Sequence, residues 1–395
     1  MKLAFIGNMN NNHFALARYL RDAGVDAHVL LTDDEYPHFH PTADSYEELP
    51  GFVHQLGWGS ARSLIRTSVE QVKNDIAPYD LLVGCGLAPA HCLRASRSLD
   101  VFAPYGSDIW EATQFRFCRP QNIPLIWNAV WRQRQAIGKC RVVHMSPCKA
   151  YESNIHRFAP HAIRWGEGLP MVYAAMYNQE LPAFVVDRSR YGSDFKRVRD
   201  ESDMMIFSSV RHAWKLSEND PNSKGTDLLL QAIAILKRRY PSLRVKLVTF
   251  EYGNDVTASR KLAEELGITD CVCWFPIMQR KDLMAGLLLS DAACGEFRWS
   301  YDSSGVILEA LVAGRPLVMH RNDKDYLSTA PAGGLCPVLN SKNPEEIAGR
   351  FEWIVSNPNT ASDFGAKGRE WYDTQVVRPA IKRYLELIQN RPVNQ

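Results

Sequence analysis

Short apolar runs alternate with longer amphipathic segments along the first part of the chain. Residues 2–7 (KLAFIG) are a β-rich apolar run, residues 13–24 (HFALARYLRDAG) have apolar residues at helical spacing, and residues 26–32 (DAHVLLT) are the next apolar run. The helical segment ends at Gly24, a typical helix terminator. The strand–helix–strand order predicts parallel strands joined by right-handed crossovers.

The same alternation continues, less regularly, up to about residue 150. Residues 79–86 (YDLLVGCG), 101–106 (VFAPYG) and 140–146 (CRVVHMS) are predicted strands. The segment after Pro124 is predicted to be helical, with Trp127 and Trp131 four residues apart on one face. We expect both tryptophans to pack into the core.

The periodicity fades between Pro170 and Asp203, where we place the interdomain linker. A second and more regular alternation of strands and helices then begins, starting with the strand of residues 204–210 (MMIFSSV) and ending with that of residues 315–320 (RPLVMH). This regularity predicts a second Rossmann-like domain.

The predicted fold class is therefore α/β, with two Rossmann-like, doubly wound domains facing each other across a cleft. We expect an N-terminal domain over residues 1–180 and a C-terminal domain over residues 200–370. Residues 371–395 are predicted to form a C-terminal helix that packs back toward the N-terminal domain. Ligands of such parallel sheets bind at the carboxyl ends of the strands.

Composition narrows the class of partner. The chain has 46 Lys and Arg against 44 Asp and Glu, a formal charge of +2, with no long block of like charges, so a nucleic-acid partner is not indicated. The first residues look like a strand rather than a signal peptide, and no apolar run is long enough to span a bilayer. The nine cysteines are scattered, and we interpret Cys271 and Cys273 as small core residues of a protein from the reducing cytoplasm.

Three cations lie in the loop that follows the first strand of the second domain. Arg211, Lys215 and Lys224 fall between that strand and a helix that begins near Thr226. Their charges and the helix amides could converge on an anion such as a diphosphate. The alternative is a solvated loop with surface cations.

A second anion site is indicated by the run SSGVILEALVAG at residues 303–314. Ser304 and Gly305 begin a helix whose first amides can bind a phosphate. Glu309 lies among apolar neighbours one turn later, so it needs hydrogen-bond donors, which ribose hydroxyls or other groups of the protein could supply. Glu296 follows a predicted strand, where either a substrate contact or an ordinary loop acid is expected.

Taken together, residues 205 to 320 resemble the donor domain of glycosyltransferase family 4 and its GT-B relatives. The resemblance rests on the order of the SSVRHAW loop, the Lys-Gly pair and the EAL-x-x-G-x-P segment. It implies that Arg211 and Lys224 hold the diphosphate of a nucleotide-sugar and that Glu309 binds its ribose.

The chain departs from the family at the first of two glutamates that are usually separated by seven residues. The position with seven residues between it and Glu309 is Tyr301, which cannot replace the first glutamate. Asp302 is an acid, but it is one position too late. The GEF segment looks like a version found in some bacterial relatives, so Glu296 is the preferred residue for contact with the sugar.

The N-terminal half resembles the family more weakly. Its first loop has asparagines where glycines are common, and Gly7, Asn10 and Asn11 are candidates for a donor or acceptor loop, with a plain turn as the alternative. The segment APYGSDIW is similar to a bacterial Tyr-Gly-Ser-Asp motif. There Asp108 is a candidate catalytic residue that orders the acceptor hydroxyl, or else a turn-forming aspartate.

No metal site is indicated by the sequence. The histidines have no pairing with helical spacing and an acid partner, and no Asp-x-Asp motif occurs. We therefore expect no required cofactor, with a UDP- or GDP-sugar as the donor substrate and its diphosphate neutralised by Arg, Lys and helix amides.

The resemblance implies a hexosyltransferase that moves a sugar to an acceptor hydroxyl with retention, in the assembly of surface polysaccharide or glycolipid. The implied acceptor is a sugar, a glycan or a lipid-linked glycan, and the implied location is cytoplasmic or peripheral at the inner membrane face. Two alternatives are a nucleotide-sugar 2-epimerase and a non-catalytic nucleotide-sugar-binding subunit. A dinucleotide-dependent oxidoreductase is disfavoured, because neither domain's first strand is followed by G-x-G-x-x-G.

Overall fold

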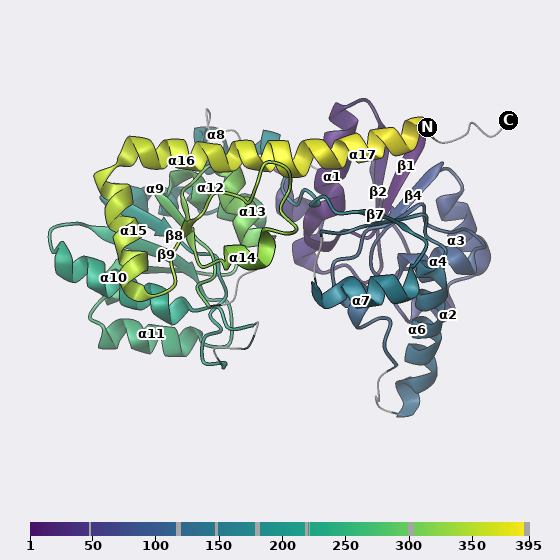
Figure 1. Cartoon of the computed structure of the whole chain (residues 1–395), viewed down its shortest axis with the longest axis horizontal. Helices are drawn as coiled ribbons and strands as arrows, with labels where there is room; N and C mark the ends of the chain where they lie inside the picture. The colour runs from purple at the N-terminus through teal and green to yellow at the C-terminus, as the bar shows by residue number, and fades with distance from the viewer. Residues whose placement is uncertain are drawn as a thin grey trace. The chain divides into compact units, whose positions relative to one another are not determined.

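The computed structural model describes residues 1–46, 49–115, 120–146, 149–177, 182–217, 220, 222–298 and 304–390. The chain divides into two compact units (Figure 1). Unit 1 comprises Met1–Tyr173 together with Val376–Gln395, and unit 2 comprises Ala174–Gln375. Unit 2 is therefore inserted between two segments of unit 1.

Unit 1 is built on a parallel sheet of seven strands in the order β3-β2-β1-β4-β5-β6-β7. The strands are β1 (Lys2–Ile6), β2 (Asp26–Leu31), β3 (Val53–Gln55), β4 (Leu81–Gly84), β5 (Val101–Phe102), β6 (Val142–His144) and β7 (Ile163–Trp165). Its α-helices are α1 (Asn12–Asp22), α2 (Ser63–Arg66), α3 (Val69–Ile76), α4 (Ala88–Arg94), α5 (Ser107–Trp110), α6 (Ile123–Ile137), α7 (Lys149–Phe158) and α17 (Arg378–Gln389).

Both faces of this sheet are covered by helices. Leu3 and Phe5 of β1 pack against α1 and α17, whereas Ala4 and Ile6 pack against α3, α4, α6 and α7. Alternate residues of a strand point to opposite faces, so a strand covered on both sides is apolar throughout. Tyr384 of α17 is fully buried in this core, and its hydroxyl hydrogen-bonds His144 Nδ1 at 3.2 Å.

Unit 2 has a parallel sheet of six strands in the order β10-β9-β8-β11-β12-β13. The strands are β8 (Met204–Phe207), β9 (Val245–Phe250), β10 (Val272–Phe275), β11 (Ala292–Cys294), β12 (Leu317–Met319) and β13 (Leu339–Asn340). The α-helices are α8 (Pro182–Arg188), α9 (Gly192–Asp200), α10 (Thr226–Arg239), α11 (Val256–Glu265), α12 (Arg280–Leu289), α13 (Gly305–Val312), α14 (Asp323–Tyr326), α15 (Pro344–Ser356) and α16 (Pro358–Trp371). A π-helix (Tyr372–Val377) follows α16.

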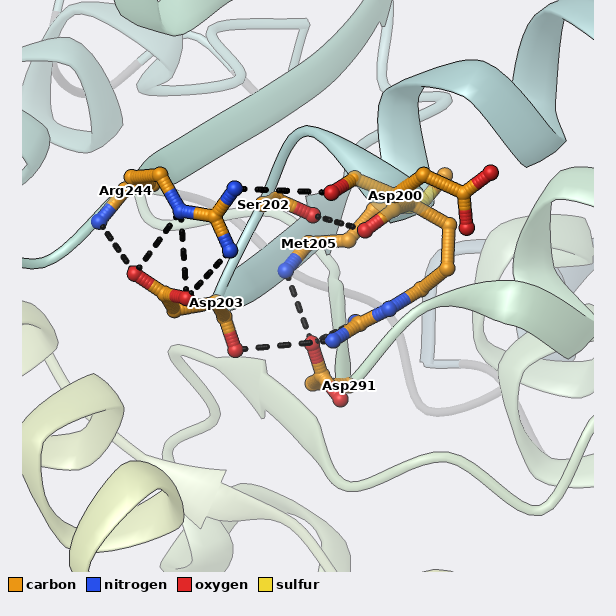
Figure 2. A network of polar contacts seen from close by, with 7 residues as sticks. Asp200, Ser202, Asp203, Met205, Arg244 and Asp291 are labelled. Atoms are coloured by element: carbon orange, nitrogen blue, oxygen red, sulfur yellow. Dashed lines mark hydrogen bonds and ion pairs between the residues drawn. The ribbon is translucent and has the colours of Figure 1, made fainter.

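A polar network fixes the amino-terminal edge of this second sheet (Figure 2). Asp203 accepts from the backbone N–H of Arg244 at 2.9 Å and from its guanidinium at 2.6 Å, and Asp291 accepts from the backbone N–H of Met205 at 2.7 Å. These bonds join the starts of β8, β9 and β11. The Arg244 guanidinium lowers the pKa of Asp203 to about 2. Because the network lies at the amino-terminal edge, it leaves the carboxyl edge for ligands.

The segment in which we predicted the linker is largely helical. Residues 182–188 and 192–200 form α8 and α9, and both helices contact α12 in unit 2. The boundary between the units lies at Tyr173–Ala174. The two helices escaped the sequence analysis because their mixed charges obscure the apolar stripe, which consists of Val185, Val186, Phe195 and Val198.

The prediction that Trp127 and Trp131 pack in the core is wrong. They lie on one face of α6, as expected, but they are 46% and 51% exposed. The buried face of α6 consists instead of smaller residues, among them Ala129, Val130 and Ala136. Small residues allow α6 to approach α4 closely, so the wide tryptophans are left on the other side.

The helices within the described ranges include none with the length and apolar character needed to cross a membrane.

Candidate functional site

A buried ion pair lies at the carboxyl edge of the unit 2 sheet. Lys224 precedes α10, and Glu296 follows β11. Lys224 Nζ is 2.9 Å from each carboxylate oxygen of Glu296, and both side chains are 9% exposed. The sequence predicted both residues as ligand contacts, and the structure brings them into direct contact with each other.

Burial and nearby positive charges have opposite effects on the pKa of Glu296. Burial raises the pKa of Glu296, while the positive charges of Lys224 and, more weakly, Arg211 oppose that rise. The Arg211 guanidinium donates to Asn222 Oδ1 at 2.9 Å. Arg211, Lys224 and Glu296 thus form one electrostatic cluster, and Lys215 lies apart as an exposed side chain near the ring of Trp214.

The backbone conformation and close contacts at residue 225 require a glycine after Lys224. It has φ +72°, and a Cβ at this position would lie 3.1 Å from the backbone nitrogen of Arg298 and 3.1 Å from Phe297 Cβ. Only glycine combines this left-handed backbone with so close an approach. The close approach keeps Lys224 against the segment that carries Glu296, whose next residue, Phe297, donates its N–H to Lys224 O at 3.0 Å.

Arg298, which the sequence analysis did not single out, anchors the cation-bearing loop. Its guanidinium donates to Asp227 Oδ2 at 2.6 Å and to the carbonyl oxygen of Trp214 at 2.5 Å. Both Arg298 and Asp227 are largely buried. Arg298 is thus a structural support for the loop between β8 and α10.

The start of α13 has the geometry of a helix N-terminus open to a ligand. Ser304 is the N-cap residue, with φ −74° and ψ 153°, and its side chain makes no capping hydrogen bond. Ser304 and Gly305 are partly exposed. The first N–H groups of a helix have no partner within the helix, so those of α13 can bind an anion. Ser303, Asp302 and Tyr301 lie outside the described residues.

Glu309 has a charged partner inside unit 2. Its Oε1 accepts from Arg280 Nε at 2.9 Å, and both side chains are 11% exposed. The sequence left two kinds of donor open for Glu309, ribose hydroxyls or groups of the protein itself. The structure shows a donor of the second kind. Arg280, the first residue of α12, was missed because nothing local in the sequence links it to a glutamate 29 positions later.

Asparagines take the place of glycines in the loop after β1 of unit 1. Asn10 and Asn11 have φ 52° and φ 60°, in the left-handed region that asparagine tolerates better than most residues. Gly7 has φ +81°, and a Cβ there would lie 2.8 Å from Cys85 Sγ. Asn8 is fully buried and stabilises the loop, since its Oδ1 accepts from the N–H of Phe14 at 2.9 Å.

Asp108 is held by backbone amides at the carboxyl edge of the unit 1 sheet. Its Oδ2 accepts from the N–H of Gly86 at 2.9 Å, and its Oδ1 accepts from those of Tyr105 and Gly106 at 3.0 and 3.1 Å. Burial raises its pKa to about 7, although the three amides act in the opposite direction. This geometry is that of a turn-forming aspartate, and it also leaves a carboxyl that titrates near neutral pH.

Glu35 is a second carboxyl at the same edge, and the sequence analysis did not identify it. Its Oε1 accepts from the N–H of Asn8 at 2.6 Å and from Thr32 Oγ1 at 3.2 Å. Burial raises its pKa to about 7. Its position after β2 follows the same rule that identified Glu296, but three consecutive acids at residues 33–35 look like a solvated turn in the sequence.

The buried histidines of unit 1 have protein partners. His13 Nδ1 contacts the carbonyl oxygen of Gly7 at 2.7 Å, and His144 Nε2 contacts that of Glu167 at 3.1 Å. Burial lowers the pKa of both to about 4, so both are neutral at neutral pH. Across the described parts of the chain, no group of three or more His, Cys, Asp or Glu side chains is placed to hold a metal ion.

A family model matches part of unit 2. Residues 217–371 match the family model of the glycosyl transferases group 1. They include Lys224, Glu296 and Glu309, whereas Arg211 lies just before the matched range.

The chain is also similar to part of a curated enzyme. The chain is 26% identical over 175 residues to the GDP-mannose-dependent alpha-(1-6)-phosphatidylinositol monomannoside mannosyltransferase of Mycolicibacterium smegmatis. The match covers 42% of this chain and 45% of that enzyme, less than half the length of each.

Solved structures share the fold over almost the whole chain. HepE of Anabaena, solved in complex with UDP, is 16% identical with a TM-score of 0.58, and the match covers 99% of this chain and 100% of HepE. The UDP-GlcNAc 2-epimerase of Neisseria meningitidis, bound to UDP-GlcNAc, is 13% identical with a TM-score of 0.60 over 99% and 100% of the two chains. At these identities the likeness establishes the fold only. The predicted α/β class and GT-B fold are confirmed.

Proposed function

We propose that the protein is a glycosyltransferase that transfers a hexosyl group from a nucleotide-sugar to an acceptor hydroxyl. The observation that carries the proposal is the buried Lys224–Glu296 pair beside Arg211, at the carboxyl edge of a sheet within or next to a group 1 domain. A pair with both side chains 9% exposed is costly to desolvate, and a structural role is served as well by apolar residues. Charges retained in such a place favour a ligand-binding role.

In the proposed mechanism, the donor diphosphate binds to Arg211, Lys224 and the amides at Ser304 and Gly305. The leaving nucleotide gains negative charge as the bond from the anomeric carbon to the phosphate oxygen breaks. Cations and helix amides that are already oriented stabilise this charge without reorganising. These groups supply positive charge without a metal, so we propose that no divalent ion is required.

We propose that Glu309 binds the ribose hydroxyls and that Glu296 contacts a hydroxyl of the transferred sugar. The Arg280 guanidinium, 2.9 Å from Glu309, orients this carboxylate, which suits an acceptor of two neighbouring hydroxyl donors. Glu296 can receive a hydroxyl when Lys224 shifts part of its interaction to the diphosphate.

On unit 1, we propose that Asp108 orders the acceptor hydroxyl and that the loop of Gly7, Asn10 and Asn11 contributes to donor or acceptor binding. A carboxyl whose pKa is raised to about 7 can accept a proton near neutral pH. The proposed acceptor is a sugar, a glycan or a lipid-linked glycan, in cell-surface polysaccharide or glycolipid assembly on the cytoplasmic side. Retention of the anomeric configuration is proposed from the family resemblance.

The donor base is proposed as uracil or guanine. The mycobacterial relative is named as GDP-mannose-dependent, and the structures of HepE and of the Neisseria epimerase contain UDP and UDP-GlcNAc. Thermal-shift measurements with a panel of UDP- and GDP-sugars would choose between them, because binding to the native state raises its stability. Transfer of a radiolabelled sugar from the stabilising donor would then test the activity.

A nucleotide-sugar 2-epimerase is the second candidate. It is favoured by the TM-score of 0.60 to the Neisseria epimerase and by two carboxyls of raised pKa, Glu35 and Asp108, on unit 1. An epimerase converts its nucleotide-sugar without an acceptor. Appearance of an epimer from the sugar donor alone would refute the transferase, and donor binding without any turnover would indicate a non-catalytic subunit.

A further inference from the structure

The outer face of α6 carries large aromatic side chains that are about half exposed. Trp127 and Trp131 are 46% and 51% exposed, while the opposite face of the helix packs on α4. Phe115 is 46% exposed, and its ring centroid lies 5.5 Å from that of Trp127. Ordinary surfaces rarely leave such neighbouring aromatic rings exposed.

Helix α2 lies against the buried side of α6. Leu64 of α2 forms a small buried cluster with Ala90 of α4 and Ala129 of α6, which brings the three helices together. We call the exposed set of Phe115, Trp127 and Trp131 on the outer side the α6 patch.

The charged side chains of the helices that form and support the α6 patch are all basic. Helices α2, α4 and α6 contain four arginines and no aspartate or glutamate, as their sequences SLIR, APAHCLR and IPLIWNAVWRQRQAI show. Arg132 lies 5.9 Å from the ring centroid of Trp131. Between Glu111 and Glu152 the sequence has seven lysines and arginines and no acid, although acids make up 44 of the 395 residues of the whole chain.

We propose that the α6 patch docks the protein onto the surface of a lipid bilayer that contains anionic lipids. Tryptophan prefers the membrane–water interface, because its ring is apolar and its N–H is polar, and neighbouring arginines attract anionic headgroups. In Figure 1, α6 extends beyond the other elements of its unit, so its outer face can reach a flat surface. The absence of acids from all three helices favours an anionic surface over a protein of mixed charge.

This inference goes beyond the proposed transferase activity and does not depend on it. It adds a surface that would hold the protein where a lipid-linked acceptor is present. A vesicle-binding assay therefore tests the docking without any turnover.

The test uses the full chain and sedimentation with sucrose-loaded vesicles of phosphatidylcholine, alone or with about one third phosphatidylglycerol. We expect binding to the anionic vesicles, weakening as salt screens the charges, and at least about tenfold weaker binding to phosphatidylcholine alone. Trp127→Ala with Trp131→Ala should lower the partition coefficient by roughly tenfold or more, since the apolar anchor is lost. Arg132→Glu should also reduce it, because Arg132 lies beside the ring of Trp131 and would no longer attract the anionic headgroups.

The matched control is Phe184→Ala with Tyr240→Ala, because these two rings are 50% and 45% exposed on unit 2. This control should bind as the wild type does. Equal or no binding of the wild type to both kinds of vesicle would overturn the proposal. Full binding by the double tryptophan variant would also overturn it, because charge alone would then explain the attraction.

Discussion

Replacement of Lys224 by alanine should destabilise the protein in a way that depends on pH. The substitution leaves the Glu296 carboxyl buried without the ammonium that lies 2.9 Å away in the wild type. Removal of one partner of a buried ion pair costs about 3–5 kcal/mol when the remaining charge stays ionised. Glu296 can avoid part of this cost by taking up a proton.

Protonation of Glu296 limits how much free energy of unfolding the variant can lose. A glutamate has a pKa of about 4.3 in an unfolded chain, so protonating it at pH 7 costs about 1.36 × 2.7, or about 3.7 kcal/mol. At pH 5 the same operation costs only about 1 kcal/mol. The folded-state pKa of this acid is raised, so the destabilisation is largest at high pH and disappears as the pH falls toward the unfolded value.

Urea unfolding at pH 7 and pH 5 measures the effect. We expect Lys224→Ala to lose up to about 3.7 kcal/mol at pH 7 and about 1 kcal/mol at pH 5, and Lys224→Ala with Glu296→Gln to recover most of the loss at pH 7. Both variants should lack transferase activity, because Lys224 is proposed to hold the diphosphate. An equal loss at both pH values, with no recovery in the double variant, would refute the reasoning.

Three other predictions concern particular contacts. Glu309→Gln and Arg280→Ala should each weaken donor binding about tenfold or more in calorimetry, and Arg280→Ala should also lower the melting temperature because it leaves the Glu309 carboxylate without this guanidinium; unchanged affinity in both would remove the ribose role. Gly225→Ala should cost about 1–3 kcal/mol in urea unfolding, because its φ of +72° and the 3.1 Å approach of Arg298 leave no room for a methyl group; a neutral effect would contradict this account. In unit 1, His13, His91 and His144, with pKa lowered to about 4, make stability rise with pH between about 4 and 6.5, while Glu35 and Asp108, with pKa raised to about 7, act in the opposite direction. Asp108→Asn should therefore make the slope of unfolding free energy against pH, measured by urea unfolding near pH 5.5, more positive by about 1.4 kcal/mol per pH unit; an unchanged slope would argue against the raised pKa of Asp108.

Periodicity along the chain was sufficient to predict the fold, because strands buried on both faces and amphipathic helices leave strong local signals. The same signals placed Lys224, Glu296 and Glu309 near the carboxyl edge of one sheet. They could not reveal that Lys224 contacts Glu296, or that Arg280 contacts Glu309, because these pairs are separated by 72 and 29 residues. Such contacts follow from the final packing of elements.

Trp127 and Trp131 illustrate the opposite error. Their spacing predicted correctly that they share a helix face, but spacing does not tell which face of a helix is buried. The buried face of α6 is the one with the smaller residues, since Ala129 and Ala136 allow the closer approach to α4.

The insertion of unit 2 between two segments of unit 1 has a consequence for folding during synthesis. Ala380, Tyr384 and Leu387 of α17 belong to the core cluster that also contains Leu3 and Phe5. The ribosome makes all of unit 2 before it makes these three residues. Unit 2 can therefore complete its core first, although domains near the N-terminus usually fold earlier. Until α17 emerges, one face of the unit 1 sheet lacks part of its cover, so the core of unit 1 is the last to be completed.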